Sequence, residues 1–286
     1  MAVAGVVLAS GVWDGGSDPG DEFPPVDRTD YGPAVTVGAG EVRPFTTSGG
    51  PTYHGVEFDR EVLTGSLPDA GSLAADRTSG DPTYDDKYGP SGRALVVHRR
   101  ESLQFFVPFP DTSETPVTFL GLNWNPEGHP GARGAWARPH FDVHFHMLGT
   151  DTVDAIEGPA PAPYDGIADE KIPAGYSRSP PPMAAERYIT DMGEHLAPAD
   201  APEVPGTPEA FENTLIQGFV AVEGRPLLAF VEPMLTREFL QEFTGRERQS
   251  VPQPSVYPHD STHPTAYEIR GDEETVTVLL RSFEPV

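Results

Sequence analysis

The sequence contains no cysteine, very few lysines and no long hydrophobic run. Without cysteine the chain cannot form disulfides, thiolate nucleophiles, zinc fingers or cysteine-ligated iron–sulfur clusters. A membrane-spanning helix needs about 18 or more apolar residues, and the apolar segment at residues 1–13 is shorter than that. These absences exclude a disulfide scaffold and predict no integral membrane segment.

Positive charge is also scarce. The 286 residues include 44 acidic against 19 basic side chains, a formal net charge of −25, and only Lys87 and Lys171 are lysines. Affinity for nucleic acid is built from positive charge, so we predict no nucleic-acid partner. A carboxylate-rich, lysine-poor surface is typical of a halophilic protein, because a Debye length of about 3 Å at 1 M salt screens the self-repulsion. The alternative is an acidic protein of ordinary salt conditions.

The first 33 residues differ in composition from the rest. Residues 1–13 are apolar and rich in small side chains, like the hydrophobic region of a signal peptide, although the preceding positive segment is missing. A frayed apolar terminus is the alternative. Residues 14–33 are rich in Gly, Asp and Pro and predict a disordered acidic linker. We expect a single β-rich domain over residues 34–286, exported from the cell; a cytoplasmic protein of a high-salt organism is the alternative.

Short segments rich in Val, Phe, Tyr, Thr and Leu alternate with long Pro/Gly/Asp loops, and their period of two predicts β-strands. The predicted strands are 42–47, 53–58, 94–98, 103–109, 117–124, 140–148, 187–190, 213–222, 227–234, 266–270 and 274–283. The long loops are 66–93, 150–183, 197–209 and 245–264. Hairpin turns are indicated at 223–225 and 271–273, and helical patterns only at 61–65 and 235–243. The fold class is therefore all-β, either a barrel or a two-sheet sandwich.

One predicted strand carries an unusual row of side chains. Because residues alternate between the two faces of a strand, His140, Asp142, His144 and His146 share one face, while the residues between them are apolar. Imidazole is the commonest protein ligand for transition metals. Same-face neighbours lie about 6–7 Å apart, so two of them can converge on one ion. If the apolar face packs between sheets, the polar face lines a barrel interior or faces water.

A metal site of this kind needs a carboxylate and a further histidine from elsewhere. Glu232 lies in an apolar strand on the same face as leucine and phenylalanine, where a lone carboxylate is costly unless it meets a cation or several donors. His195 follows Gly193, which indicates a bend after the predicted strand 187–190. The expected ligands are His140, His144, His195 and Glu232. The alternative is a solvent-facing polar strand and a Glu232–arginine salt bridge.

The segment Pro139-His140-Phe141-Asp142-Val143-His144-Phe145 resembles the marker motif of an uncharacterised family of prokaryotic proteins that are often exported. Segments 40–58, 122–129, 192–195, 231–234, 251–253 and 264–267 are also similar to that family. The resemblance covers roughly residues 34–286 and implies one β-rich, oligomeric domain without an established activity. Its motif positions match His140, Asp142, His144, His195 and Glu232. His146 stands where the family usually has an aromatic residue, which makes it the least secure ligand.

Two functions are compatible with these patterns. The first is an exported β-barrel protein with no assignable reaction that assembles into a homo-oligomer through its sheets and loops. Its His/Glu cluster is then either a structural site for one Zn, Fe or Mn ion or a hydrogen-bonded core. The second is a cupin-like oxygenase, isomerase or hydrolase that uses the same metal. In both, Asp142 would orient an imidazole and His146 would be a further ligand or a neighbour of the ligands. No P-loop, nucleophile elbow or dinucleotide fingerprint is present in the sequence.

Overall fold

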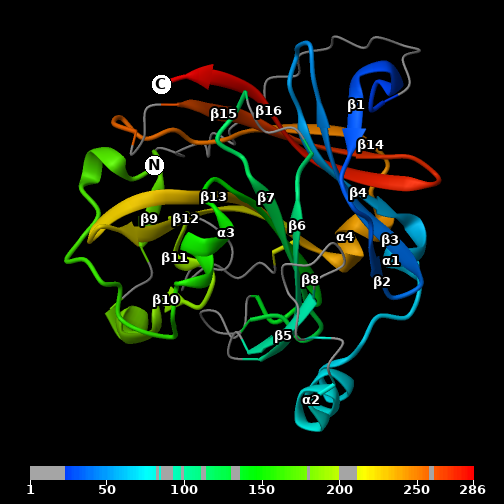
Figure 1. The fold of residues 1–286 in the computed structure, drawn as a ribbon, viewed down its shortest axis with the longest axis horizontal. Helices are drawn as coiled ribbons and strands as arrows, with labels where there is room; N and C mark the ends of the chain where they lie inside the picture. Colours follow the sequence, from blue (N-terminus) through cyan, green and yellow to red (C-terminus); the bar gives the residue numbers. More distant parts are fainter. Residues whose placement is uncertain are drawn as a thin grey trace, which may run out of the picture.

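The computed structural model describes residues 23–81, 84, 93–97, 100–110, 114–129, 136–178, 181–199, 211–257 and 261–286. In these ranges the chain is built mainly from antiparallel strands, with a few short helices (Figure 1). The expected signal-like segment, residues 1–13, lies outside the described residues. Among the residues that are described, no helix is both long and apolar enough to cross a membrane.

The strands are short, and most of them contain no more than eight residues. They are β1 Thr29–Tyr31, β2 Val35–Val37, β3 Gly40–Thr47, β4 His54–Asp59, β5 Arg93–Val97, β6 Glu101–Pro108, β7 Phe119–Asn125, β8 His140–His146, β9 Tyr176–Arg178, β10 Tyr188–Ile189, β11 Gly193–Pro198, β12 Asn213–Val222, β13 Arg225–Thr236, β14 Gly245–Ser250, β15 Thr262–Gly271 and β16 Thr275–Pro285. The α-helices are α1 Arg60–Thr64, α2 Ala70–Ser79, α3 Thr150–Asp154 and α4 Arg237–Glu242. The 3-10 helices are Val26–Arg28, Asp169–Lys171 and Pro181–Glu186.

Within the described ranges the strands form two antiparallel sheets. The seven-stranded sheet has the order β1-β3-β4-β16-β15-β14, with β2 also paired to β3. The nine-stranded sheet has the order β10-β11-β12-β13-β8-β7-β6-β5, with β9 also paired to β11. Neither sheet closes on itself, so a sandwich describes the fold and the barrel alternative does not. Strand β1 already belongs to a sheet, so paired structure begins inside residues 14–33, which were expected to form a linker.

Local sequence signals explain several of the observed elements. The hairpin between β12 and β13 turns at Glu223 and Gly224, whose φ angles of 50° and 73° are those of the tight hairpin turn that a glycine favours. Helix α4 begins after Thr236, whose hydroxyl accepts a hydrogen bond from the Phe239 amide. Helix α2 lies in the range 66–93 that was expected to be a loop. It is capped by Asp69, which accepts a hydrogen bond from the Ser72 amide.

The two sheets pack face to face over a shared hydrophobic core. On β8 the core-facing residues Phe141, Val143 and Phe145 are fully buried, and the Phe141 ring lies 5.4 Å from that of Phe58 in the other sheet. The core also contains Val278 of the seven-stranded sheet. The apolar face of β8 therefore packs between the two sheets. The histidine face of β8 therefore points away from the second sheet, into the hollow of its own sheet.

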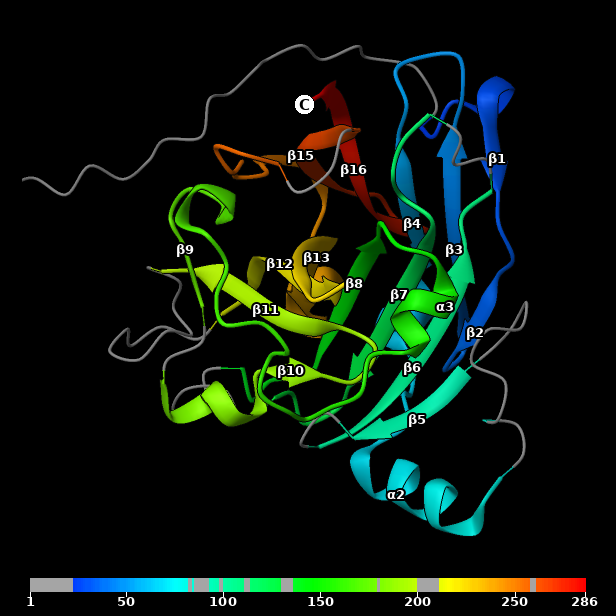
Figure 2. The ribbon, with the colours of Figure 1, turned by 60° about the vertical axis from the view of Figure 1, so that its left-hand side comes forward.

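The nine-stranded sheet is strongly curled (Figure 2). Its two ends approach each other without pairing: Gln104 on β6 donates a hydrogen bond of 3.0 Å to Asp191, which lies in the turn between β10 and β11. Asn123 on β7 donates in turn to the Gln104 side-chain oxygen at 3.0 Å. All three side chains are buried. The curl gives the sheet a concave, polar inner face, and β8 lies in the middle of it.

The seven-stranded sheet contains a buried charge cluster of its own. The Glu268 carboxylate is fully buried and forms ion pairs with Arg246, Arg270 and Arg281. Burial alone would raise the pKa of this carboxyl, but the hydrogen bonds and charges of the three arginines hold it below the usual value.

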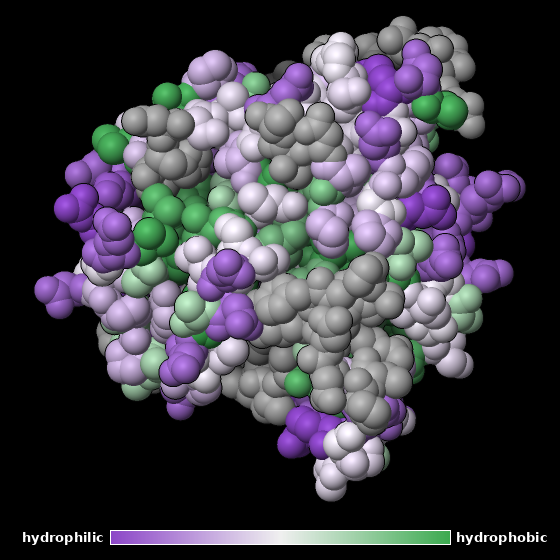
Figure 3. Space-filling model, in the orientation of Figure 1, coloured by the Kyte–Doolittle hydropathy of each residue, from purple (hydrophilic) through white to green (hydrophobic). Residues whose placement is uncertain are grey.

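On the face of the molecule drawn in Figure 3, hydrophilic residues project mainly around the periphery.

Candidate metal centre

The concave face of the nine-stranded sheet buries an almost continuous row of polar side chains. On β8, His140, Asp142, His144 and His146 are each at most 1 % exposed. Strand pairing sets Gly121 of β7 opposite His144. An imidazole or carboxylate in such a position must find a hydrogen-bond partner or a cation. A buried polar atom of this row that has no partner within the protein is therefore a candidate for binding a ligand.

Three of the expected ligands meet on this face. The Nε2 atoms of His144 and His195 each lie 3.5 Å from Oε2 of Glu232, and the ligand atoms of the three residues all lie within 4.8 Å of one another. We call His144, His195 and Glu232 the His144 cluster. For an ion bound tetrahedrally at about 2.0–2.1 Å, ligand atoms lie roughly 3.4 Å apart. The two 3.5 Å distances are therefore those of donors around a single metal ion.

The hydrogen bonds of the His144 cluster leave acceptor atoms facing one another. Nδ1 of His144 donates to the Gly121 carbonyl at 3.2 Å, so in the neutral ring Nε2 carries a lone pair. Among the described residues, neither His144 Nε2 nor Glu232 Oε2 has a hydrogen-bond partner. Two buried acceptors at 3.5 Å are unfavourable unless a cation lies between them.

Burial also sets the protonation of this cluster. It lowers the pKa of His144 to about 4, which keeps the ring neutral and able to bind a metal at physiological pH. It raises the pKa of Glu232 well above the usual value, and the negative charge of Asp142 adds to this effect. A metal ion would supply the positive charge that the Glu232 carboxylate lacks.

His195 lies within a regular strand, where the sequence indicated only a bend. Residues 191–193 form the turn, with φ of 74° at Gly193, and His195 lies inside β11 opposite Gly218 of β12. A Cβ atom at Gly193 would lie 2.4 Å from the Phe219 carbonyl oxygen, so this position requires glycine. The expected bend is confirmed. The side chain of His195 is 19 % exposed, and it is the member of the cluster that reaches solvent.

An aromatic ring holds the histidines in place. The Phe230 ring lies 4.8 Å from that of His144, 5.4 Å from that of His195 and 5.5 Å from that of His146. It occupies the space that Gly218 leaves open, because a Cβ atom there would lie 2.0 Å from Phe230 Cζ. Packing on a rigid apolar ring restricts the rotamers of the ligands, as a metal site requires.

His146 does not join the His144 cluster. Its ring is stacked on that of Phe119 at 4.3 Å, with an interplanar angle of 13°, and burial lowers its pKa well below the usual value. It therefore packs as a neutral aromatic ring. His146 is therefore not retained as a ligand.

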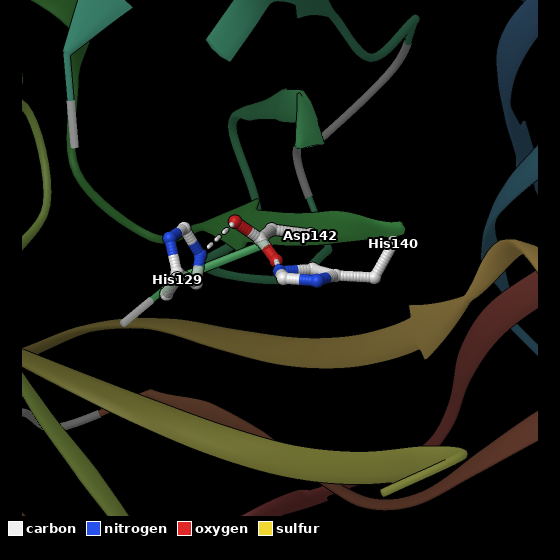
Figure 4. A group of neighbouring side chains, drawn as sticks. All are labelled: His129, His140 and Asp142. Carbon is white, nitrogen blue, oxygen red and sulfur yellow. Dashed lines mark hydrogen bonds and ion pairs between the residues drawn. The ribbon is translucent and has the colours of Figure 1, made fainter. Parts of the chain in front are cut away.

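His140 was expected to share an ion with His144, and the structure does not bring these two residues together. Along a strand, residues four positions apart are separated by about 13 Å, too far for one ion. His140 instead meets Asp142 and His129 (Figure 4), and the ligand atoms of these three residues also lie within 4.8 Å of one another. We call them the Asp142 cluster. Asp142 thus lies in a cluster of its own, beside the His144 cluster.

In the Asp142 cluster the carboxylate is shared between two imidazoles. Oδ2 of Asp142 lies 3.1 Å from Nε2 of His129, and Oδ1 lies 3.1 Å from Nε2 of His140. Burial alone would raise the pKa of Asp142, but positive charge on His140 and His129, together with the hydrogen bond to His129, holds it well below the usual value. His129, in the turn that follows β7, is not among the ligands expected from the sequence. The pairing of Asn125 with His140 across β7 and β8 is the signal that brings this turn to the start of β8.

No family model, curated protein or solved structure matches this chain. The resemblance to an exported prokaryotic family, carried by the motif Pro139–Phe145, stays a prediction. What can be said of the site therefore follows from its own geometry: buried histidines and carboxylates whose arrangement is suited to a metal ion.

Proposed function

We propose that this protein binds one divalent transition-metal ion through Nε2 of His144, Nε2 of His195 and a carboxylate oxygen of Glu232. The observation that carries the proposal is the pair of 3.5 Å distances from one Glu232 oxygen to the two imidazole nitrogens, in a buried site where that oxygen has no hydrogen-bond partner among the described residues. Two imidazoles and one carboxylate suit Zn, Fe or Mn.

A titration of metal-free protein tests this proposal. The chain is treated with chelator, returned to high-salt buffer and titrated with Zn²⁺ in a calorimeter. We expect His195→Asn and Glu232→Gln each to lose one bound ion per chain relative to the wild type. Glu242→Gln is the matched control, because it removes the same charge from an exposed position on α4 and should bind like the wild type. Equal binding by all four proteins would refute the site.

A catalytic role is the second candidate. Three protein ligands leave at least one coordination position open, and His195 connects the cluster to solvent. Catalytic zinc and non-haem iron sites share both features, whereas structural zinc sites have four protein ligands. If an open position exists, azide added to the Co²⁺-loaded protein should change its visible spectrum. An unchanged spectrum would favour a closed, structural ion.

A further inference from the structure

The concave face contains a second set of potential ligands that the proposed site does not use. His140, Asp142 and His129 come from the start of β8 and from the chain that follows β7. They share no residue with the His144 cluster. The side chains of His140 and Asp142 are 0 % and 2 % exposed, so their polar atoms need partners inside the protein.

When the His140 ring is neutral, two of these buried atoms face each other as acceptors. Nδ1 of His140 lies 2.7 Å from the carbonyl oxygen of Arg138, which can only accept, so Nδ1 carries the proton and Nε2 of the neutral ring a lone pair. That Nε2 lies 3.1 Å from Oδ1 of Asp142. Neither atom has a hydrogen-bond partner among the described residues. A cation between them would turn the unfavourable contact into two coordination bonds.

The third donor lies at the edge of the same space. Nε2 of His129 is 3.1 Å from Oδ2 of Asp142, and the ring of His129 lies 4.7 Å from that of His140 at an angle of 68°. The His129 side chain is 21 % exposed. It can therefore bind an ion arriving from solvent and complete a set of two imidazoles and one carboxylate.

Neutral side chains hold the Asp142 carboxylate in place through hydrogen bonds. Asn125 Nδ2 donates to Asp142 Oδ2 at 2.8 Å, and Ser102 donates to the side-chain oxygen of Asn125 at 2.5 Å. The three residues lie on β8, β7 and β6, and all are buried. Hydrogen bonds of this kind orient a metal-binding carboxylate and leave its other oxygen free to coordinate.

We propose that His129, His140 and Asp142 form a second mononuclear site for a divalent transition-metal ion, so that the concave face binds two ions per chain. The second ion is coordinated by Nε2 of each imidazole and by Oδ1 of the carboxylate. Because no ligand is shared with the His144 cluster, loss of a ligand from one site leaves the ligands of the other in place. This inference does not depend on the proposed function.

The two sites can be separated with a reciprocal pair of variants. His129→Asn and His195→Asn each remove one partly exposed imidazole, with exposures of 21 % and 19 %, and leave the buried ligands of β8 in place. The metal-free proteins are titrated with Zn²⁺ in high salt, and circular dichroism establishes that each is folded. We expect two ions per chain in the wild type, one in each variant and none in the double variant.

Each of the other outcomes refutes one of the two sites or both. Two ions in His129→Asn, or one ion in the wild type that only His195→Asn loses, overturns the second site. One ion that only His129→Asn loses supports the second site and refutes the proposed function. A wild type that binds no zinc refutes both. A measurement without variants completes the test: Zn²⁺ should protect His129 from modification by diethylpyrocarbonate, read by mass spectrometry, and equal modification with and without zinc overturns the proposal.

Discussion

Replacing Glu232 by glutamine should make the metal-free protein more stable and the metal-loaded protein less stable. In the absence of metal, the Glu232 carboxylate is buried with Oε2 unpaired, which costs about 1–3 kcal/mol. An amide nitrogen at that position donates to Nε2 of His144, which lies 3.5 Å away. We expect the variant to gain about 1–2 kcal/mol, or roughly 2–8 °C in melting temperature for a chain of this size.

The pH dependence of this gain in stability follows from the direction in which the pKa of Glu232 is shifted. The folded-state pKa of Glu232 is raised above the usual value of 4.5. Below that value the carboxyl is protonated in both the folded and the unfolded chain, so wild type and variant should differ little. As pH rises through the folded-state pKa, the wild type loses stability while glutamine is unaffected. The advantage of the variant should therefore grow with pH and then level off.

Zinc should reverse the order. At a free concentration 100 times its dissociation constant, an ion stabilises the folded state by about 2.7 kcal/mol per site. The wild type should gain this amount in excess of Glu232→Gln in thermal melts followed by circular dichroism at pH 8, with Glu242→Gln as the charge-matched control. A metal-free Glu232→Gln that melts at or below the wild type at pH 8 would refute the reasoning, because the carboxylate would then be satisfied by hydrogen bonds.

Three further substitutions test separate parts of the structure. Gly218→Ala places a Cβ atom 2.0 Å from Phe230 Cζ. Urea denaturation should show that the free energy of unfolding falls by about 1–3 kcal/mol, and the variant should bind zinc more weakly. Wild-type zinc affinity would contradict the packing role of the Phe230 ring. His146→Phe should retain the stack on Phe119 and bind as many zinc ions as the wild type; loss of an ion would make His146 a ligand. Glu268→Gln should cost about 1–3 kcal/mol at pH 7 by urea denaturation. Because the folded-state pKa of Glu268 is lowered, its contribution is present above pH 4.5 and lost as pH falls through that folded-state pKa, so the difference from the wild type should shrink in acid; a constant difference would contradict the ion-pair cluster.

Alternation along single strands was sufficient to predict much of the fold. The period of two in the segment 140–146 placed the histidines on one face and the phenylalanines in the core, as the structure has them. Strand β12 was predicted with its observed bounds. Strand β14 was missed, because its sequence Gly245–Ser250 is polar and it lies at a sheet edge, where burial imposes no apolar pattern.

The site was harder to predict than the fold because it depends on which strands are neighbours. Glu232 and His195 were expected beside His144, and both lie there. His140 was placed in the same set because it shares a face with His144, although four residues along a strand is too great a distance for one ion. His129 was not counted as a ligand, because its approach to Asp142 depends on the pairing of β7 with β8. Export, adaptation to high salt and oligomer formation stay predictions from the sequence.

The strict alternation along β8 also limits how this strand can pair during folding. A shift by a single residue against β7 or β13 would turn the imidazoles and the carboxylate of Asp142 into the apolar layer between the sheets and expose the phenylalanines to the polar hollow. Such misaligned pairings are strongly penalised, since each would bury several unsatisfied polar groups at once. The residues that offer ligands to metals therefore also help to align the central strand of the sheet.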